Sequence, residues 1–294
     1  MRTLFLVEPR TVPMAATIPV FDPAPDIRLI VADMDGTLLD DEKELHEHFW
    51  PLIDELHARG ILFSPASGRQ YYTLLREFEE IADEMVFIAE NGSLVMRQGR
   101  EISSDCLTRT DALRLVRTLR EAAADGVDGG VVVCGKYSAF IERSDQPFFE
   151  QVDKYYARLK VVDDLLPVID DDVLKIAVYD FDSAEQRTLP VLSEFMDSHK
   201  VTVSGAHWLD VNARTANKGH AISALQTAFG ITPAQTMVFG DFLNDLEMMD
   251  TADYAFAMHN AHPLLRERAK FVAPSNNDNG VVRTIASILD IPLV

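Results

Sequence analysis

Hydrophobic and polar positions near the start of the chain form an alternating series of strands and helices. Residues 27–32 are apolar apart from one arginine, as in a buried strand, whereas residues 42–59 place apolar side chains at helical intervals. The same order then returns, with strands expected at residues 61–64 and 85–89 and a helix at residues 71–81. This alternation predicts an α/β fold: a Rossmann-like, doubly wound parallel sheet with helices on both faces.

The middle of the chain has paired strands instead of regular alternation. Helices are expected there at residues 111–124, 148–159 and 189–198, and strands at residues 131–134, 138–142, 174–179 and 200–204. After a strand at residues 209–212, the alternation resumes with helices at residues 218–229, 244–249 and 281–289 and a strand at residues 236–239. The pattern predicts a core of residues 27–104 and 206–294, interrupted by an inserted α+β domain of residues 105–205.

The first segment of the chain has a different composition. Prolines are spaced through residues 1–26, and proline interrupts both helices and interior strands. We therefore expect residues 1–26 to form an irregular N-terminal extension, and Met14 is a candidate for the natural start of the protein.

The charge balance is strongly acidic. The chain has 27 Lys and Arg against 47 Asp and Glu, a net charge of −20, which disfavours a protein that binds nucleic-acid phosphates. Its longest apolar runs fall well short of the roughly 18 residues that span a bilayer, so neither a membrane segment nor an export signal is expected. Cys106 and Cys134 are its only cysteines, which suits a reducing cytoplasm better than a disulfide-stabilised fold. We expect a cytoplasmic protein, and its oligomeric state stays open.

Polar side chains lie at four positions where strands of the predicted core end or the chain re-enters it, and ligands of open α/β sheets bind beyond the carboxyl ends of the strands. These positions hold Asp33-Met34-Asp35-Gly36-Thr37, Ser67-Gly68-Arg69, Lys218, and Gly240-Asp241 with Asn244-Asp245. Asp33 and Asp35 are two residues apart in extended chain, so both side chains point the same way. Carboxylates held this close require a cation or a proton between them. Together with Asp241 and Asp245, they form an all-oxygen donor set that suits Mg²⁺.

A carboxylate beside such a cation can attack phosphorus and form an aspartyl-phosphate that water then hydrolyses. Asp33 suits the nucleophile, and Asp35 suits the group that protonates the leaving oxygen and later deprotonates the water. Ser67 and Lys218 would hold the phosphate oxygens through a hydroxyl hydrogen bond and a positive charge. Each motif alone is more often a turn or a helix cap, and it is their combination that favours phosphoryl chemistry.

The four motifs together resemble those of the haloacid dehalogenase-like phosphatases, and more narrowly the Cof-type subfamily with a large cap domain. The chain matches the first motif, DxDGTLL, from Asp33 to Leu39, and the second at Ser67 in Ala-Ser-Gly-Arg. It matches the third at Lys218 in Asn-Lys-Gly and the fourth at Gly240-Asp241 with Asn244-Asp245. The resemblance runs from about residue 27 to the C-terminus and includes Glu90-Asn91-Gly92-Ser93.

This resemblance implies a Mg²⁺-dependent phosphatase that acts on a small organic phosphate, such as a sugar phosphate or a phosphorylated cofactor. Asp33 would be the nucleophile and Asp35 the general acid and base. Mg²⁺ would be held by Asp33, the backbone carbonyl of Asp35, and Asp241, with support from Asp245. The phosphate and the substrate would be bound by Met34, Gly36, Thr37, Ser67, Gly68, Arg69, Asn91, Lys218 and Asn244. The inserted domain would be the cap that closes over the substrate and excludes water.

The sequence departs from the family's usual pattern on the substrate side. Ser67 replaces a commoner threonine, bulky Phe242 and Leu243 occupy positions where small residues are frequent, and His259 replaces a common glycine. In the inserted domain, the candidates for contact with the substrate are Lys136, Tyr137, Arg143 and Lys175, which the sequence does not rank.

Two other functions remain open at this point. A phosphomutase would use the same nucleophile and return the phosphoryl group to the substrate. A signalling phospho-acceptor also gathers an aspartate, a hydroxyl and a lysine at strand ends, although the large insertion and the acid Asp35 argue against it. A binding protein without catalysis is disfavoured, because the residues that the chemistry needs are present.

Overall fold

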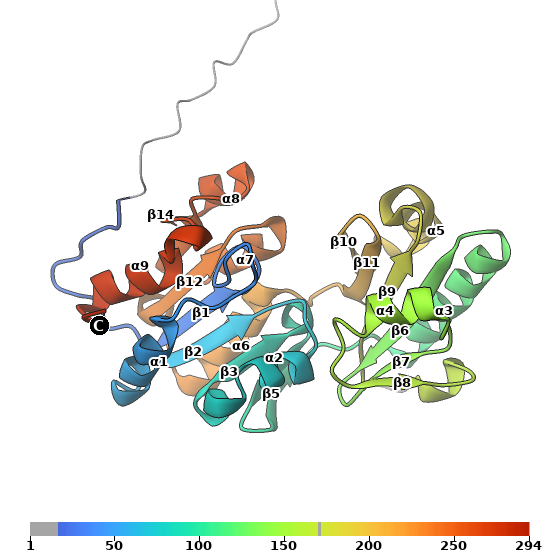
Figure 1. Cartoon of the computed structure of the whole chain (residues 1–294), viewed down its shortest axis with the longest axis horizontal. Helices are drawn as coiled ribbons and strands as arrows, with labels where there is room; N and C mark the ends of the chain where they lie inside the picture. Colours follow the sequence, from blue (N-terminus) through green and yellow to red (C-terminus); the bar gives the residue numbers. More distant parts are fainter. Residues whose placement is uncertain (1–16, 170–171, 294) are drawn as a thin grey trace, which may run out of the picture.

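The computed structural model describes residues 17–169 and 172–293 and contains two β-sheets. Figure 1 shows the sheets in separate lobes, with the inserted residues in green and yellow beside the rest of the chain. The architecture is mixed α/β with a mainly parallel core sheet, which confirms the predicted fold class. Within the described ranges, no helix combines the length and the apolar character needed to cross a membrane.

The core sheet has eight strands in the order β14-β13-β12-β1-β2-β3-β4-β5. Their bounds are β1 (Leu29–Asp33), β2 (Leu62–Ala66), β3 (Val86–Ala89), β4 (Leu94–Arg97), β5 (Arg100–Ser104), β12 (Thr236–Gly240), β13 (Tyr254–Met258) and β14 (Phe271–Ala273). The strands from β14 to β3 run parallel, and β1 lies between β12 and β2. All five residues of β1 are buried, as the apolar run near the start of the chain predicts.

The hairpin of β4 and β5 is antiparallel and extends the core sheet beyond β3, and the sequence analysis missed it. Its strands are half-buried and carry charged residues, so they lack the apolar run that marks the other core strands. The sequence signal that could have revealed the hairpin is Gly99 in its turn. Gln98 and Gly99 both have positive φ, of 50° and 69°, the conformation that a two-residue hairpin turn requires.

Helices connect the parallel strands (Figure 1). They are α1 (Phe49–Ala58), α2 (Tyr71–Glu77), α6 (Lys218–Phe229), α7 (Leu246–Met249), α8 (Pro263–Arg268) and α9 (Gly280–Leu289), with short 3₁₀ turns η1 (Glu79–Glu84), η2 (Glu90–Gly92), η6 (Pro233–Gln235), η7 (Leu243–Asp245) and η8 (Asn276–Asp278). The expectation of one helix over residues 42–59 was wrong, because the helix begins only at Phe49. Lys43 adopts a positive φ of 68° within a turn in which the Asp40 side chain accepts from the Glu44 N–H. Pro51 lies in the first turn of α1, where its missing N–H costs nothing.

The inserted domain is built on a six-stranded sheet in the order β10-β11-β9-β6-β7-β8. Its strands are β6 (Gly129–Gly135), β7 (Ala139–Ile141), β8 (Leu159–Val161), β9 (Val173–Asp180), β10 (His199–Val203) and β11 (Trp208–Ala213), and its helical segments are α3 (Arg109–Ala124), α4 (Gln146–Val152), η3 (Leu166–Val168), η4 (Ala184–Thr188), α5 (Leu189–Val191) and η5 (Ser193–Phe195). Residues of α3 share one hydrophobic cluster with Ile176 of β9, and Phe148 of α4 belongs to a second cluster with Ala177. Alternate residues of β9 therefore serve two different packing surfaces.

The inserted domain differs from the sequence expectations in several details: the helix expected over residues 148–159 ends at Val152, and the unexpected strand β8 follows it. β11 pairs with β9 and β10, so this sheet extends to Ala213, beyond residue 205 where the sequence pattern placed its end. The expected helix over residues 189–198 is broken into short turns around Pro190.

Residues 17–28 contain no helix or strand, whereas Met14 lies outside the described residues. Phe21 in this segment packs edge-on against the rings of Tyr254 and Phe271, with centroid distances of 5.1 and 5.4 Å. The segment is thus irregular but held against the core by aromatic contacts.

Candidate active site

The parallel strands bring the polar segments together at one edge of the core sheet. Asp33 is the last residue of β1, Ser67 follows β2, and Asp241 follows β12. β1 is flanked by β2 and β12, and Ala32 lies opposite Pro65 on one side and Phe239 on the other. The three strands therefore end at the same level, so the chemistry collects at their carboxyl ends.

Lys218 occupies the centre of this edge. It is the first residue of α6, and the Asn217 side chain caps the helix by accepting from the His220 N–H at 2.8 Å. The Lys218 ammonium is fully buried, contacts Asp33 Oδ1 and donates to Asp245 Oδ1 at 2.7 Å. The two acidic partners raise the pKa of Lys218 more than burial lowers it, so the side chain stays a cation.

Two carboxylates that contact this cation form a candidate metal centre together with a third, Asp241. Asp33, Asp241 and Asp245 each offer one oxygen, and these oxygens lie within 4.8 Å of one another. The second oxygen of Asp245 accepts from the Asp241 N–H at 3.0 Å, and Thr37 Oγ1 donates to Asp241 Oδ1 at 3.3 Å. The backbone and Thr37 thus fix two of the three donors in place.

The electrostatics of this cluster favour a cation. Burial, together with the negative charges of Asp245 and Asp241, raises the pKa of Asp33 to about 8 even though Lys218 acts in the opposite direction. Burial and Asp245 likewise raise the pKa of Asp241 to about 6. One ammonium therefore leaves the carboxylates under-neutralised, and an all-oxygen donor set of this kind fits a hard divalent ion.

Asp35 lies apart from that cluster and belongs to an ion-pair group. Its carboxylate accepts from Arg69 Nη2 at 3.0 and 3.1 Å and lies 2.9 Å from Lys43 Nζ. Burial raises the pKa of Asp35, but Arg69 and Lys43 outweigh it and hold that pKa below its ordinary value. No local sequence pattern indicated Lys43, because it lies in a turn far along the chain from any strand end.

Backbone hydrogen bonds fold the loop after β2 tightly. Ser67 Oγ accepts from the Arg69 N–H at 3.2 Å, and the Ser67 carbonyl accepts from the Asn91 N–H at 2.9 Å. A Cβ on Gly68 would lie 3.0 Å from the Asn91 amide nitrogen, and Asn244 donates to Asn91 Oδ1 at 3.3 Å. The structure thus gathers Ser67, Gly68, Asn91 and Asn244 in one place.

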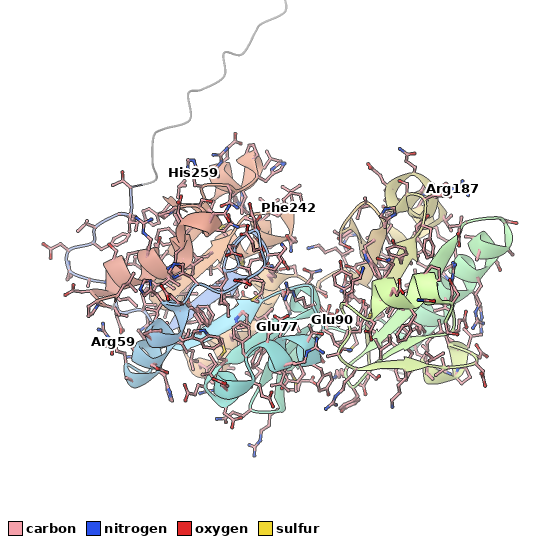
Figure 2. All side chains as sticks on the ribbon, viewed as in Figure 1. Arg59, Glu77, Glu90, Arg187, Phe242 and His259 are labelled. Carbon is pink, nitrogen blue, oxygen red and sulfur yellow. The ribbon has the colours of Figure 1, made fainter. Side chains whose placement is uncertain are left out.

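The remaining predicted site residues have different surroundings. The Met34 side chain is buried in the core, so only its backbone is available to a ligand. The Gly36 carbonyl accepts from Asn260 Nδ2 at 2.8 Å, a contact to which the sequence analysis assigned no role. Phe242 is 54% exposed, and Figure 2 shows it on the same lobe as His259.

The candidates in the inserted domain divide into two kinds. Tyr137 is exposed, Lys136 pairs with Glu101 and Asp172, and Arg143 is paired with acidic neighbours of its own domain. Lys175 alone among these four is buried.

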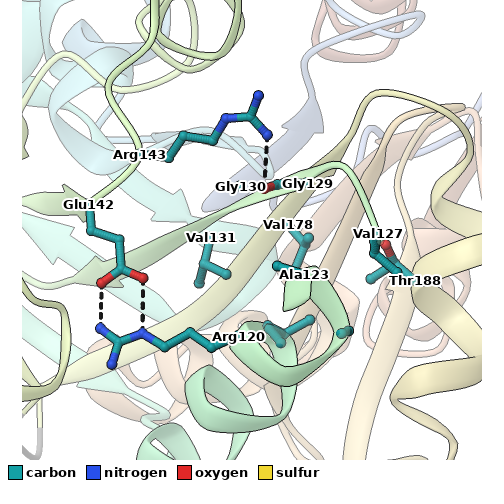
Figure 3. A pocket seen from close by; sticks show the side chains of 12 residues that line it. Arg120, Ala123, Val127, Gly129, Gly130, Val131, Glu142, Arg143, Val178 and Thr188 are labelled. Carbon is teal, nitrogen blue, oxygen red and sulfur yellow. Dashed lines mark hydrogen bonds and ion pairs between the residues drawn. The ribbon is translucent and has the colours of Figure 1, made fainter. Parts of the chain in front are cut away.

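A small cavity within the inserted domain is lined by Arg143 and by none of the other three candidates (Figure 3). Its volume is about 70 Å³, and Arg120 at its edge is paired with Glu142. Pockets for metabolites are several times larger, so this cavity is a packing feature.

Comparisons with known proteins agree with this geometry. The sequence of residues 30–285 matches the family described as haloacid dehalogenase-like hydrolase. The chain is 34% identical to the 5-amino-6-(5-phospho-D-ribitylamino)uracil phosphatase YbjI of Escherichia coli, over 90% of this chain and 96% of that protein. It is 26% identical to the phosphatase YcsE of Bacillus subtilis, named for the same compound, over 88% of this chain and 95% of that protein.

A solved structure extends the comparison to the whole fold. A haloacid dehalogenase-like hydrolase from Bacteroides thetaiotaomicron superimposes with a TM-score of 0.78 at 22% identity, covering 89% of this chain and 99% of that one. Its arrangement is therefore the fold found here, and the resemblance drawn from the four motifs is confirmed. The chain belongs to the haloacid dehalogenase-like hydrolase family.

Proposed function

We propose that this hydrolase is a Mg²⁺-dependent phosphatase that removes the phosphoryl group from a small phosphorylated metabolite through an aspartyl-phosphate on Asp33. The observation that carries the proposal is the buried Lys218 ammonium between Asp33 and Asp245, with Asp241 beside them. An ordinary structural ion pair does not need a third, under-neutralised carboxylate at the end of a parallel strand.

Asp33, Asp241 and the backbone carbonyl of Asp35 would hold Mg²⁺, with Asp245 in support. When bound, the ion supplies positive charge that neutralises these carboxylates and the oxygens of the substrate phosphate. Lys218 supplies a fixed positive charge beside Asp33, and the Ser67 hydroxyl and the loop amides supply hydrogen-bond donors for the phosphate.

The reaction has two displacements. In the first, an oxygen of Asp33 bonds to phosphorus, the bond from phosphorus to the ester oxygen breaks, and Asp35 gives its proton to that leaving oxygen. In the second, Asp35 takes a proton from water, the water oxygen bonds to phosphorus, and the bond to Asp33 breaks. Phosphate is released, and both aspartates return to their starting states.

Asp35 must hold a proton for the first step, although Arg69 and Lys43 disfavour the protonated form. A bound phosphate brings negative charge toward these two cations and weakens their hold on Asp35. The same negative charge raises the pKa of Asp35, so substrate binding itself prepares the acid.

The substrate class follows from the relatives. Two of them are named as phosphatases of 5-amino-6-(5-phospho-D-ribitylamino)uracil, a phosphate ester on a small polyol chain. We infer a substrate of this size for the present chain, a sugar phosphate or a phosphorylated cofactor, rather than a nucleic acid or a lipid. The cytoplasmic location expected from the two cysteines stays a prediction.

The test is phosphate release from a panel of phosphomonoesters that includes this phosphoribitylaminouracil, with Mg²⁺ and with EDTA. Wild type is compared with Asp33→Asn and with Asp54→Asn, a control that removes an exposed carboxylate from α1. We expect release that needs both Mg²⁺ and Asp33 and is unchanged by Asp54→Asn. Turnover by Asp33→Asn, or isomerised sugar phosphate without free phosphate, would overturn the proposal.

A further inference from the structure

The side chain of Lys175, in the inserted domain, contacts the core. It lies in the middle of β9, is 4% exposed, and its ammonium donates to the carbonyl oxygen of Gly68 at 3.2 Å. The same ammonium lies 2.7 Å from Glu90 Oε2 and 3.5 Å from Asp210 Oδ1 of β11. Figure 2 places Glu90 where the two lobes meet, so this buried charge group sits at the boundary between the domains.

The composition of the group keeps Lys175 charged. Burial lowers the pKa of Lys175, but Asp210 and Glu90 raise it by more, so the net shift is upward. A buried ammonium with two carboxylates around it is a costly way to join two domains, because each charge loses its hydration.

Uncharged contacts already join the domains beside this group. Gln70 exchanges two hydrogen bonds with the Arg158 backbone, at 2.8 and 3.0 Å, and Thr73 Oγ1 donates to the Tyr155 carbonyl at 3.0 Å. Asn212 donates to Ser93 Oγ at 2.9 Å. Adhesion between the domains therefore does not require Lys175, and its position calls for a different explanation.

The contact with Gly68 supplies that explanation. The carbonyls of Ser67 and Arg69 accept from the backbone N–H groups of Asn91 and Glu90, both in the core. For the Gly68 carbonyl, by contrast, the donor recorded among the described residues is Lys175 of the inserted domain. This carbonyl shares its peptide plane with the Arg69 N–H, which donates to Ser67 Oγ. When Ser67 Oγ accepts from that N–H, its own proton is free to point at a phosphate oxygen.

From this geometry we infer that Lys175 is a positioning residue for the phosphate site, an inference that rests on the proposed function. Its ammonium fixes the peptide between Gly68 and Arg69, and this peptide orients the Ser67 hydroxyl and the loop amides toward the phosphate. Phosphate affinity therefore depends on the position of the inserted domain. This holds even for inorganic phosphate, which has no leaving group for that domain to contact.

The experiment measures the Kd of inorganic phosphate in the presence of Mg²⁺ by isothermal titration calorimetry, together with kcat, KM and the thermal unfolding temperature. Lys175→Met keeps an unbranched side chain one atom shorter and removes the charge. The double variant Lys175→Met with Glu90→Gln also removes the carboxylate that the single variant leaves unpaired. Ile176→Ala is the matched control. Ile176 is the next residue of β9, so its side chain points to the opposite face of the sheet, where it packs with α3.

We expect Lys175→Met to raise the Kd of phosphate about 10-fold, the effect of losing one charged hydrogen bond. The double variant should recover part of the lost unfolding temperature and keep the weakened Kd. Ile176→Ala should unfold at a lower temperature and bind phosphate as wild type does. If Lys175→Met does not fold, the double variant carries the comparison.

Wild-type affinity in the Lys175→Met or the double variant would overturn the inference, and so would an equal loss of affinity in Ile176→Ala. Because the probe is phosphate itself, the result does not depend on turnover. Phosphate binding without ester hydrolysis by wild type would contradict the proposed function while leaving the role of Lys175 measurable, and a wild type that binds no phosphate would overturn both.

Discussion

Arg69 holds Asp35 through both oxygens of its carboxylate, with Nη2 at 3.0 and 3.1 Å, while the other terminal nitrogen of the guanidinium contacts Glu77. The proposed acid therefore sits in a pre-formed ion pair and not in an apolar pocket. Its pKa is lowered, whereas that of the proposed nucleophile Asp33 is raised. The pKa shifts of the two aspartates thus have opposite signs, which is typical of carboxylates with different catalytic roles.

Arg69→Gln should move the basic limb of the kcat/KM profile to higher pH. Removing the cation raises the pKa of Asp35, by about one unit for a neighbouring charge, so the protonated acid persists to higher pH. The measurement is phosphate release between pH 5 and pH 9, roughly the range in which an enzyme acid of this kind titrates. Glu77→Gln is the control, because it leaves Arg69 beside Asp35 and should leave the limb in place. A limb that stays fixed or moves to lower pH in Arg69→Gln would argue against Asp35 as the acid.

Lys218→Met should destabilise the protein strongly and remove activity. The substitution leaves Asp33 and Asp245 buried without their cation, a loss of about 3–5 kcal/mol in the free energy of unfolding. Phosphate release should fall at least about 100-fold, as when one charge-stabilising group is removed. Urea unfolding and a phosphate assay measure the two effects.

Lys270→Met is the matched control for that substitution. Lys270 lies 2.7 Å from Asp253, the same distance that separates Lys218 from Asp245, but both side chains of this pair are about half exposed. Its loss should cost no more than about 1 kcal/mol. Equal effects of the two substitutions would mean that burial does not set the importance of Lys218.

The sequence pattern selected residues that the structure brings together, because these residues lie at or next to strand ends. Asp33 ends an apolar run, and Lys218 begins a helix behind the cap Asn217, so local patterns located both. In parallel strands, residues far apart in the chain then meet at one edge, and this rule alone joins Asp33 to Asp241.

Other features depend on contacts that no local pattern contains. Lys175 lies within a strand that is buried along its whole length, and its importance appears only when β9 of the inserted domain meets the loop after β2. Lys43 contacts Asp35 from a turn, and the helical spacing of residues 42–59 had assigned this turn to a helix. Tertiary packing decided both positions, as it did for the hairpin of β4 and β5.

Without a divalent cation, the stability of the protein should fall as the pH rises from about 4 to 8. Asp33 and Asp241 lose their protons near pH 4 when unfolded. In the folded protein they keep them up to pKa values of about 8 and 6. The folded state thus binds more protons in this window, so the free energy of unfolding decreases with pH. Urea unfolding in EDTA at several pH values tests this, and a rise in stability over the window would contradict it. Saturating Mg²⁺ should flatten the dependence, because the ion replaces the protons.

Gly36→Ala should weaken Mg²⁺ binding without unfolding the protein. Gly36 has a φ of 79°, and a Cβ there would lie 2.4 Å from Asp241 Oδ2, so the added methyl group displaces a proposed ligand of the cation. Gly99→Ala provides the control: its φ of 69° imposes a similar backbone strain of about 1–2 kcal/mol, but a Cβ there meets no atom of the described residues within 4 Å. Both variants should lose similar stability in EDTA, and only Gly36→Ala should need a higher Mg²⁺ concentration for half-maximal phosphate release. Both substitutions impose a similar backbone strain, so a difference in their Mg²⁺ requirement reports the contact with Asp241. An unchanged Mg²⁺ requirement in Gly36→Ala would place the cation away from Asp241.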